Sequence, residues 1–296
     1  MLFPLTIARN TYRFLLSFPA ARAIRRMVDE GVPASLVPAL HYLIDAKVAA
    51  SERGTLAPID DLRSRVATRS DRKPLVFDSP HPLRPGEKDP VPGPVKTTEW
   101  CWTAERSSVT RHWGTFLFLC AKHSHPRTIL ELGGCAGISA CYLAAASQSS
   151  RLITVEGSAD LAAVAAANLR EINPTAKVVN AMFDDALDQL LPALSGSLDL
   201  VHIDGQHNRA STIHYFDRFQ PHLGRGALII FDDIHWSDDM RRAWRDIAQT
   251  GGVSHAIDVG RYGVCVWKGD GSQPKQYNFA RYTGEWRDEN APGFGK

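Results

Sequence analysis

The 296-residue sequence lacks the marks of a disulfide-stabilised or membrane-spanning protein. No Cys-x-x-Cys pair occurs, and the five cysteines are scattered, at Cys101, Cys120, Cys135, Cys141 and Cys265. An odd, dispersed set argues against a disulfide scaffold or a zinc site and indicates a reducing compartment, so we expect a cytoplasmic protein. No apolar run approaches the roughly 20 residues that a membrane-spanning helix needs, so we expect no membrane span.

An excess of charge of one sign is also absent, since 34 Lys and Arg residues face 32 Asp and Glu residues. A net charge of +2 is too small to predict nucleic acid as a partner. The N-terminus is locally basic, with five arginines before Asp29. Arg9, Asn10 and Arg13 interrupt any secretory apolar core, which disfavours a cleaved signal. The composition is compatible with a transit peptide, but it favours an amphipathic helix that packs on the domain or on a second subunit.

The pattern of the chain changes near its first third. Residues 1–70 have apolar positions at helical spacing, as in "LVPALHYLIDAKVAA" and "IDDLRSRVA". Six prolines in residues 78–95 predict an extended linker or loop. A helix is expected in "SSVTRHWGTFLFLCAKH", and from Thr128 onward short β-rich runs alternate with helical ones. The β-rich runs are "TILEL", "RLITVE", "AKVVNA", "LDLVHID", "GALIIFDD", "VSHAID" and "YGVCVW".

This alternation predicts βαβ crossovers and therefore an α/β fold of the Rossmann-like, doubly wound type. We expect a mostly parallel seven-stranded sheet, with the last two runs antiparallel at one edge because no helix separates them. The predicted organisation has three parts. Residues 1–95 form a helical extension and linker that serves as a lid or dimer surface, residues 96–270 form the main domain, and residues 271–296 form a tail.

Carboxylates end the predicted strands, at Glu131, Glu156, Asp204 and the pair Asp232–Asp233. Ligands of open α/β sheets bind beyond these strand ends. The glycines after the first run, Gly133, Gly134 and Gly137, do not fit the dinucleotide pattern G-x-G-x-x-G, whose loop carries no acid. Acids instead favour a cationic nucleoside such as S-adenosylmethionine. We expect Gly133 and Gly137 to let the backbone approach its methionine part, and Glu156 to accept both ribose hydroxyls.

The segments "ELGGCAGIS", "ITVEGS" and "LDLVHIDG" together resemble the successive motifs of class I S-adenosylmethionine-dependent methyltransferases. The resemblance covers about residues 98–268 and implies S-adenosylmethionine as the cofactor. Cys135 replaces the middle glycine of the usual loop, as is typical of the catechol O-methyltransferase branch, and we expect its thiol to pack under the loop. The expected cofactor-binding residues are Glu131, Gly133, Gly134, Cys135, Gly137, Ser139, Glu156, Gly157, Met182, Phe183 and Asp204.

Three aspartates at two adjacent strand ends suit a hard cation such as Mg²⁺. In the metal-dependent O-methyltransferases, both the catechol and the macrolide-sugar branch, the metal ligands lie at these two strand ends. The resemblance therefore implies Asp204, Asp232 and Asp233 as ligands. His207 matches the D-x-x-H base of the macrolide-sugar branch, so we expect it to act as the catalytic base.

Other roles remain open for several of these polar residues. Asp233 could instead cap a helix that begins near Trp236. Trp236 and His235 either line the pocket or pack against the protein, and packing is favoured. His202, within a strand, is expected to be a hydrogen-bonded core histidine.

The favoured function is Mg²⁺-assisted O-methylation of a small hydroxylated molecule, such as a natural product or sugar. Two alternatives stay open, a metal-independent methyltransferase and a catalytically silent module that binds the cofactor. A nicotinamide-dependent dehydrogenase is disfavoured by Glu131 and by the glycine spacing. The expected partner is the small-molecule acceptor, and a homo-oligomer through the N-terminal helices is compatible with the pattern.

Overall fold

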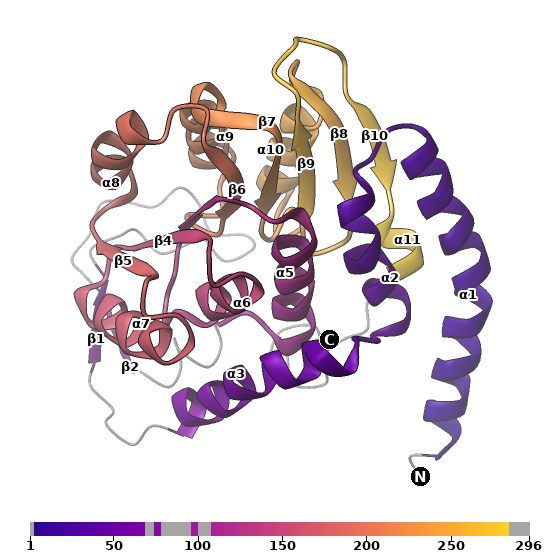
Figure 1. The fold of residues 1–296 in the computed structure, drawn as a ribbon, viewed down its shortest axis with the longest axis horizontal. Coiled ribbons are helices and arrows are strands. Elements are labelled where there is room, and N and C mark those ends of the chain that lie inside the picture. The colour runs from indigo at the N-terminus through magenta and orange to yellow at the C-terminus, as the bar shows by residue number, and fades with distance from the viewer. Residues whose placement is uncertain (1–2, 69–73, 78–95, 100–107, 284–296) are drawn as a thin grey trace.

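The computed structural model describes residues 3–68, 74–77, 96–99 and 108–283 (Figure 1). The proline-rich stretch at 78–95 and Cys101 lie outside the described residues. The N-terminal helices are α1 (Phe3–Asp29), α2 (Val37–Asp45) and α3 (Ala50–Thr68). A two-stranded antiparallel sheet follows, formed by β1 (Pro74–Phe77) and β2 (Lys96–Glu99). The sequence pattern did not predict this small sheet.

The main domain alternates strands and helices as predicted. Its strands are β3 (Thr128–Leu132), β4 (Arg151–Glu156), β5 (Lys177–Asn180), β6 (Leu198–Ile203), β7 (Leu223–Phe231), β8 (Val253–Asp258), β9 (Gly263–Trp267) and β10 (Lys275–Asn278). Its helices are α5 (Arg111–Ser124), α6 (Ile138–Ala146), α7 (Ala159–Ile172), α8 (Phe183–Leu190), α9 (Arg209–Phe219), α10 (Asp238–Ile247) and α11 (Ala280–Thr283).

Short polar side chains fix where several of these helices begin. The Ser158 hydroxyl accepts a hydrogen bond from the Leu161 backbone N–H at the start of α7. Asn208 and Ser237 do the same for α9 and α10. Each such cap satisfies one of the backbone donors that the first helical turn leaves without a partner. These helix starts therefore follow from local sequence chemistry.

The main sheet has eight strands in the order β10-β8-β9-β7-β6-β3-β4-β5. Strands β3 to β7 pair with one another in parallel, whereas β9 is antiparallel to both β7 and β8. The predicted α/β fold is confirmed, including the antiparallel pairing of the last two runs. The expected count of seven strands is too low, because β10 adds an eighth strand parallel to β8. β10 and α11 occupy the start of the segment predicted as a tail.

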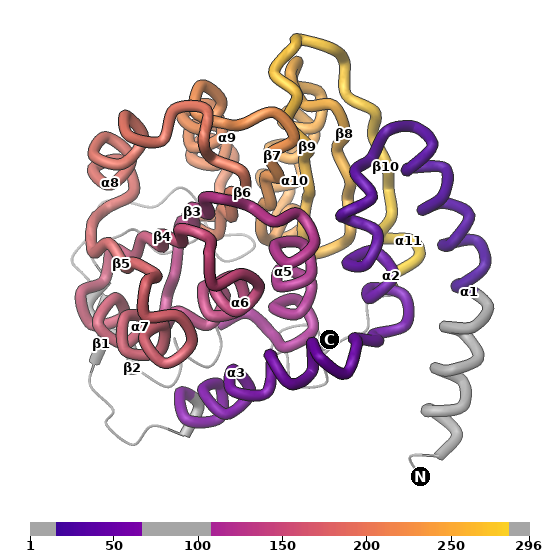
Figure 2. Tube along the Cα trace, viewed as in Figure 1, coloured from indigo at the N-terminus to yellow at the C-terminus, as the bar shows by residue number. Residues whose placement is uncertain are grey.

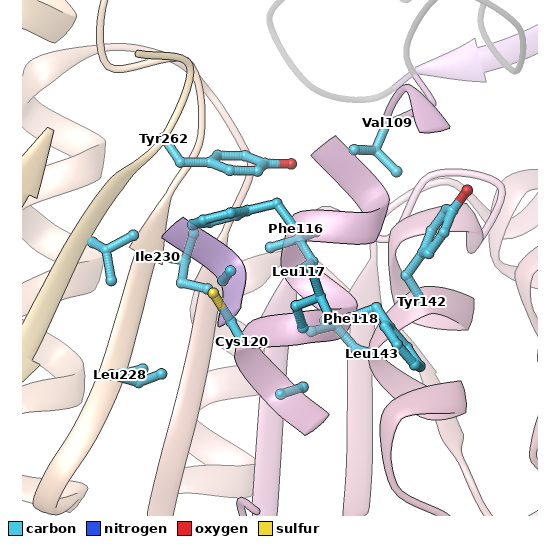
Figure 3. Packing of buried hydrophobic residues seen from close by; sticks show 14 of the residues in the cluster. Val109, Phe116, Leu117, Phe118, Cys120, Tyr142, Leu143, Leu228, Ile230 and Tyr262 are labelled. Atoms are coloured by element: carbon cyan, nitrogen blue, oxygen red, sulfur yellow. The ribbon is translucent and has the colours of Figure 1, made fainter. Parts of the chain in front are cut away.

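Two hydrophobic clusters cover the two faces of this sheet. One lies under α5 and α6 and includes Phe116, Phe118 and Tyr142, all buried. In Figure 3 the side chains of α5 lie between Tyr142 on one side and Tyr262, just before β9, on the other. The second cluster, under α8, α9 and α10, includes Phe216. Burial of apolar surface on both faces is what a mostly parallel sheet requires.

The N-terminal helices pack into the first of these clusters. Ile24 and Met27 of α1 and Leu43 of α2 are almost fully buried within it. Figure 2 shows α1 at the outer side of α2 and near α11. The end of α1 is fixed by polar contacts, because Tyr277 of β10 donates a hydrogen bond to the Glu30 carboxylate at 2.7 Å. Within the described residues, no helix is both long and apolar enough to span a membrane.

Candidate active site

The strand ends that carry the predicted site residues are adjacent in the sheet. Strand β3 pairs with β4 on one side and with β6 on the other, and β6 pairs with β7. All four are parallel, so their carboxyl ends meet at one edge of the sheet. The glycine-rich loop after β3 therefore lies beside Glu156 at the end of β4 and Asp204 after β6. Backbone hydrogen bonds join Asp204 to Leu132 (2.9 Å) and Asp232 to Ile203 (2.9 Å).

The loop of residues 133–137 is packed tightly between β6 and α7. Gly133 has a φ of +91°, and a Cβ placed there would lie 1.6 Å from the Asp204 carbonyl oxygen. Gly137 has a φ of +80°, and a Cβ there would lie 2.8 Å from Cα of Ala165 in α7. Only glycine combines a positive φ with such close backbone approach. These glycines first serve the packing of the loop, which in turn sets the shape of the strand-end surface.

Glu131, predicted at the mouth of this loop, is instead fully buried within the sheet. Its Oε2 accepts a hydrogen bond from the Thr154 hydroxyl at 2.6 Å, and its Oε1 lies 3.0 Å from His202 Nδ1. Both carboxylate oxygens are therefore occupied by neighbouring strands. Glu131 thus links β3 to β4 and β6, and its expected contact with the cofactor stays a prediction. His202 is confirmed as a hydrogen-bonded core histidine.

Glu156 is the acid that faces the glycine-rich loop. Its Oε2 accepts from the Cys135 backbone N–H and its Oε1 from the Ser158 backbone N–H, both at 2.8 Å. Burial raises the pKa of this carboxyl group, and the two N–H donors oppose that rise. Cys135 packs against the core beneath the loop, as predicted. Burial raises the pKa of the Cys135 thiol, which leaves it unreactive near neutral pH.

The remaining predicted cofactor residues lie around this loop in different environments. Met182, before α8, is 39% exposed, and its sulfur lies 3.2 Å from where a Cβ on Gly157 would be. Phe183 turns inward and packs edge-on against Tyr215, with ring centroids 5.4 Å apart. Ser139, in the first turn of α6, is buried. Met182 and Gly157 thus contribute surface beside Glu156, whereas Phe183 and Ser139 are largely internal.

The second group of predicted residues forms a compact cluster. His207 Nε2 lies 3.2 Å from Oδ1 of Asp204 and 3.6 Å from Oδ2 of Asp233. His207 and Asp233 both have a positive φ, of 32° and 52°, which is uncommon for residues other than glycine. Asp204, His207 and Asp232 each offer a ligand atom, and these atoms lie within 4.8 Å of one another. The predicted D-x-x-H and double-aspartate segments therefore come together.

Arg261, in the turn between β8 and β9, also belongs to this cluster, and the sequence pattern did not reveal it. Its Nε and Nη2 donate to Oδ1 and Oδ2 of Asp232, each at 2.7 Å. Nη2 also lies 3.5 Å from Oδ1 of Asp233. A two-pronged guanidinium–carboxylate pair of this kind is among the strongest charge-assisted hydrogen bonds in proteins. No local motif marks Arg261, because only the β8–β9 hairpin brings it to the strand end.

The charges of this cluster shift the pKa values of its members. Burial and the charge of Asp232 raise the pKa of Asp233 to about 6. Burial also raises the pKa of Asp204, together with the Asp232 charge. For Asp232, burial acts in the same direction, but Arg261 outweighs it and lowers the pKa. Burial disfavours a charged His207, yet Asp204 and Asp233 outweigh that effect and raise its pKa to about 9.

The residues after Asp233 differ from their sequence expectations. Asp233 does not cap a helix, because α10 begins at Asp238 and Ser237 caps it. Trp236 is 44% exposed rather than packed, and its ring centroid lies 6.5 Å from that of His207. His235 Nε2 lies 2.8 Å from Oδ2 of Asp258. An exposed indole therefore borders the carboxylate cluster.

Comparison with known proteins supports this picture of the domain. Residues 130–234 match a family model described as "Methyltransferase domain". The catechol O-methyltransferase of Mycobacterium tuberculosis is 34% identical over 131 residues, which are 44% of this chain and 58% of that protein. The catechol O-methyltransferase of Niastella koreensis is likewise 34% identical over 131 residues, covering 43% and 58% of the two chains. The chain thus spans less than two thirds of the length of these curated relatives.

A solved structure confirms the fold over a longer range. The O-methyltransferase from Bacillus cereus, in complex with SAH, superimposes with a TM-score of 0.51 at 20% identity. The match covers 77% of this chain and 96% of that one. Residues 130–234 therefore resemble a methyltransferase domain, as the sequence motifs predicted, and this part of the chain is similar in sequence to the two catechol O-methyltransferases.

Proposed function

We propose that the protein transfers the methyl group of S-adenosylmethionine to a hydroxyl group of a small molecule. The observation that carries the proposal is an overlap. The residues that match the methyltransferase family, 130–234, contain the glycine-rich loop, Glu156, Asp204 and the pair Asp232–Asp233. The two curated relatives are named catechol O-methyltransferases, which supports a hydroxyl as the acceptor.

The cofactor would lie against the loop of residues 133–137. The Glu156 carboxylate, held by the backbone N–H groups of Cys135 and Ser158, would accept the ribose hydroxyls. Exposed Met182 would cover the nucleoside beside Gly157. The buried Glu131 would act indirectly, since it holds β3, β4 and β6 in register beneath the loop. Gly134 and Ser139 would shape the loop and the first turn of α6.

The carboxylate cluster has a chemistry that suits a divalent cation. Asp204, His207 and Asp232 offer ligand atoms within 4.8 Å of one another, and an oxygen of Asp233 lies 3.6 Å from His207 Nε2. Such a set fits Mg²⁺, which prefers carboxylate oxygens and retains sites for water and substrate. When bound, the cation would acidify the acceptor hydroxyl as a Lewis acid. The three aspartates would hold it and orient the acceptor next to the methyl donor.

His207 would take the proton from the acceptor hydroxyl. The His207 side chain is 17% exposed, and its buried Nε2 lies 3.2 Å from Oδ1 of Asp204 and 3.6 Å from Oδ2 of Asp233. Their negative charge is also the reason why its pKa is raised to about 9. A cation that neutralises these carboxylates would favour the neutral imidazole that a base requires. The proposed roles of metal and histidine are thus electrostatically linked.

A methyltransferase that needs no metal is the second candidate. One observation favours it, namely that both oxygens of Asp232 already accept hydrogen bonds from Arg261. In that case His207 alone would act on the acceptor, and the aspartates would position it. The two candidates differ in their response to a chelator.

A methyl-transfer assay tests the proposal. The full chain is incubated with labelled S-adenosylmethionine and a set of catechols, phenols and sugars, with and without EDTA, and O-methyl products are measured by mass spectrometry. We expect Asp204→Ala to abolish turnover and His207→Ala to lower kcat by about 10²–10⁴-fold. The control is His214→Ala, which removes the α9 histidine of an exposed ion pair with Asp184 of α8. Unchanged activity in EDTA would favour the metal-independent methyltransferase. A His207→Ala enzyme as fast as the parent would show that His207 is not the catalytic base.

A further inference from the structure

Arg261 places a permanent positive charge where the proposed cation would bind. The arginine donates to both oxygens of Asp232, which is only 2% exposed. Oδ1 of Asp232 also accepts the Asp233 backbone N–H at 2.7 Å, so both lone pairs of Oδ1 have donors. Oδ2 keeps one lone pair beyond the bond to Nη2. A cation could therefore share Asp232 with the arginine only through Oδ2.

Electrostatics makes this sharing unfavourable. A divalent cation on Oδ2 would lie within a few ångströms of the guanidinium, and like charges at that distance repel strongly in a buried site. Without a cation, however, Arg261 is the charged partner of the buried Asp232 carboxylate, because its Nε and Nη2 donate to both carboxylate oxygens. Arg261 thus stabilises the carboxylate cluster when no cation is bound and opposes the binding of a cation.

Arg261 is anchored through its backbone, whereas its side chain is partly open to solvent. Its side chain is 28% exposed, so part of it already contacts solvent. Its backbone carbonyl accepts the Ile234 N–H at 3.2 Å, which ties the β8–β9 turn to the segment after β7. If the guanidinium released Asp232 and turned toward solvent, this backbone contact would not have to break.

We propose that Arg261 and a divalent cation compete for Asp232, so that the arginine sets how tightly the protein holds the metal. The inference deepens the proposed function and rests on its carboxylate site. In the metal-free protein Arg261 occupies both oxygens of Asp232. Metal entry requires the guanidinium to release at least one of them. The protein therefore binds the ion more weakly than the same carboxylates would without the arginine.

Mn²⁺ binding to the full chain, measured by electron paramagnetic resonance without acceptor or cofactor, tests this directly. Arg261→Met removes the charge and keeps much of the length of the side chain. We expect this variant to bind Mn²⁺ at least about 10-fold more tightly than the parent. The matched control is Arg209→Met, because Arg209 also joins two elements through an aspartate, Asp246 of α10, but lies outside the cluster. We expect the control to bind Mn²⁺ as the parent does.

Thermal denaturation gives a second readout. Without metal, Arg261→Met should melt at a lower temperature than the parent, because the buried Asp232 loses its partner. Saturating Mn²⁺ should raise the melting temperature of the variant by more than that of the parent. If Arg261→Met does not fold, Arg261→Lys replaces it, since one ammonium cannot make the two-pronged bond. That variant should then bind Mn²⁺ several-fold more tightly than the parent.

The outcomes separate this inference from the proposed function. Mn²⁺ affinity in Arg261→Met (or in Arg261→Lys, where the first does not fold) that is equal to or below that of the parent overturns the competition. Absence of Mn²⁺ binding in both parent and variant overturns it as well. Tighter binding by the variant supports it even if no acceptor is methylated in the activity assay. Loss of methyl transfer alone therefore contradicts only the proposed function.

Discussion

Replacement of Gly133 by alanine should damage the fold and the cofactor site together. A Cβ at this position would lie 1.6 Å from the Asp204 carbonyl oxygen, whereas real Cβ contacts essentially never fall below 3.0 Å. The loop after β3 and the end of β6 must therefore separate by more than an ångström. Overpacking of this kind costs about 1–3 kcal/mol. The positive φ of Gly133 adds about 1–2 kcal/mol for any residue with a Cβ.

Gly226 of β7 offers a matched control for the backbone term. Its φ is +87°, close to the +91° of Gly133, but no atom lies within 4 Å of where its Cβ would be. Gly226→Ala should therefore lower the free energy of unfolding by only about 1–2 kcal/mol. Gly133→Ala should lower it by about 2–5 kcal/mol, as the sum of both effects.

Urea denaturation of the two variants and of the parent measures these differences, and calorimetry with S-adenosylhomocysteine measures the effect on the site. We expect Gly133→Ala to weaken binding at least about 10-fold and Gly226→Ala to leave it unchanged. Equal destabilisation by the two substitutions would refute the argument from close packing. Full cofactor affinity in a destabilised Gly133→Ala would show that the loop does not form part of the cofactor-binding site.

Two further predictions concern carboxylates with different tasks. Glu156→Ala should weaken S-adenosylhomocysteine binding by about 1–3 kcal/mol in calorimetry. The control Glu171→Ala, at an exposed ion pair with Arg65, should leave the affinity unchanged. If Glu156→Ala binds the ligand as tightly as the parent, Glu156 does not hold the ligand. Burial acts to raise the pKa of Asp199, but the bonds from Arg127 lower it. This pair therefore stabilises the fold above the unfolded pKa of about 3.9 and ceases to do so as pH falls through the lowered folded value. Asp199→Asn should cost about 1 kcal/mol at pH 7 and almost nothing near pH 2, and a pH-independent difference in urea denaturation would contradict this.

The sheet could be predicted because its strands carry a strong local signal. β3 (TILEL) is buried at all five positions, and its limits match the apolar run in the sequence. β10 (KQYN) was missed because its side chains are mostly exposed, so no apolar pattern marks it. Its pairing with β8 depends instead on tertiary contacts, including the bond from Tyr277 to Glu30.

The site could be predicted only where its residues follow strands directly. Asp204, Asp232 and Asp233 each stand one or two residues beyond a strand, so the parallel sheet brings them together. Arg261 reaches the same cluster from an antiparallel hairpin, and nothing in its neighbourhood distinguishes it from a surface arginine. The direction of the Glu131 side chain was equally hidden, because it depends on Thr154 and His202 in other strands.

Cofactor binding tests the central claim most directly, because it requires no knowledge of the acceptor. Isothermal titration of the full chain with S-adenosylmethionine, S-adenosylhomocysteine and NAD compares the ligand classes under the same conditions. The arrangement of the glycine-rich loop and Glu156 predicts micromolar-range affinity for the first two ligands and no heat of binding for NAD. Tight binding of NAD with no response to S-adenosylhomocysteine would contradict the proposal that this domain is a working methyltransferase.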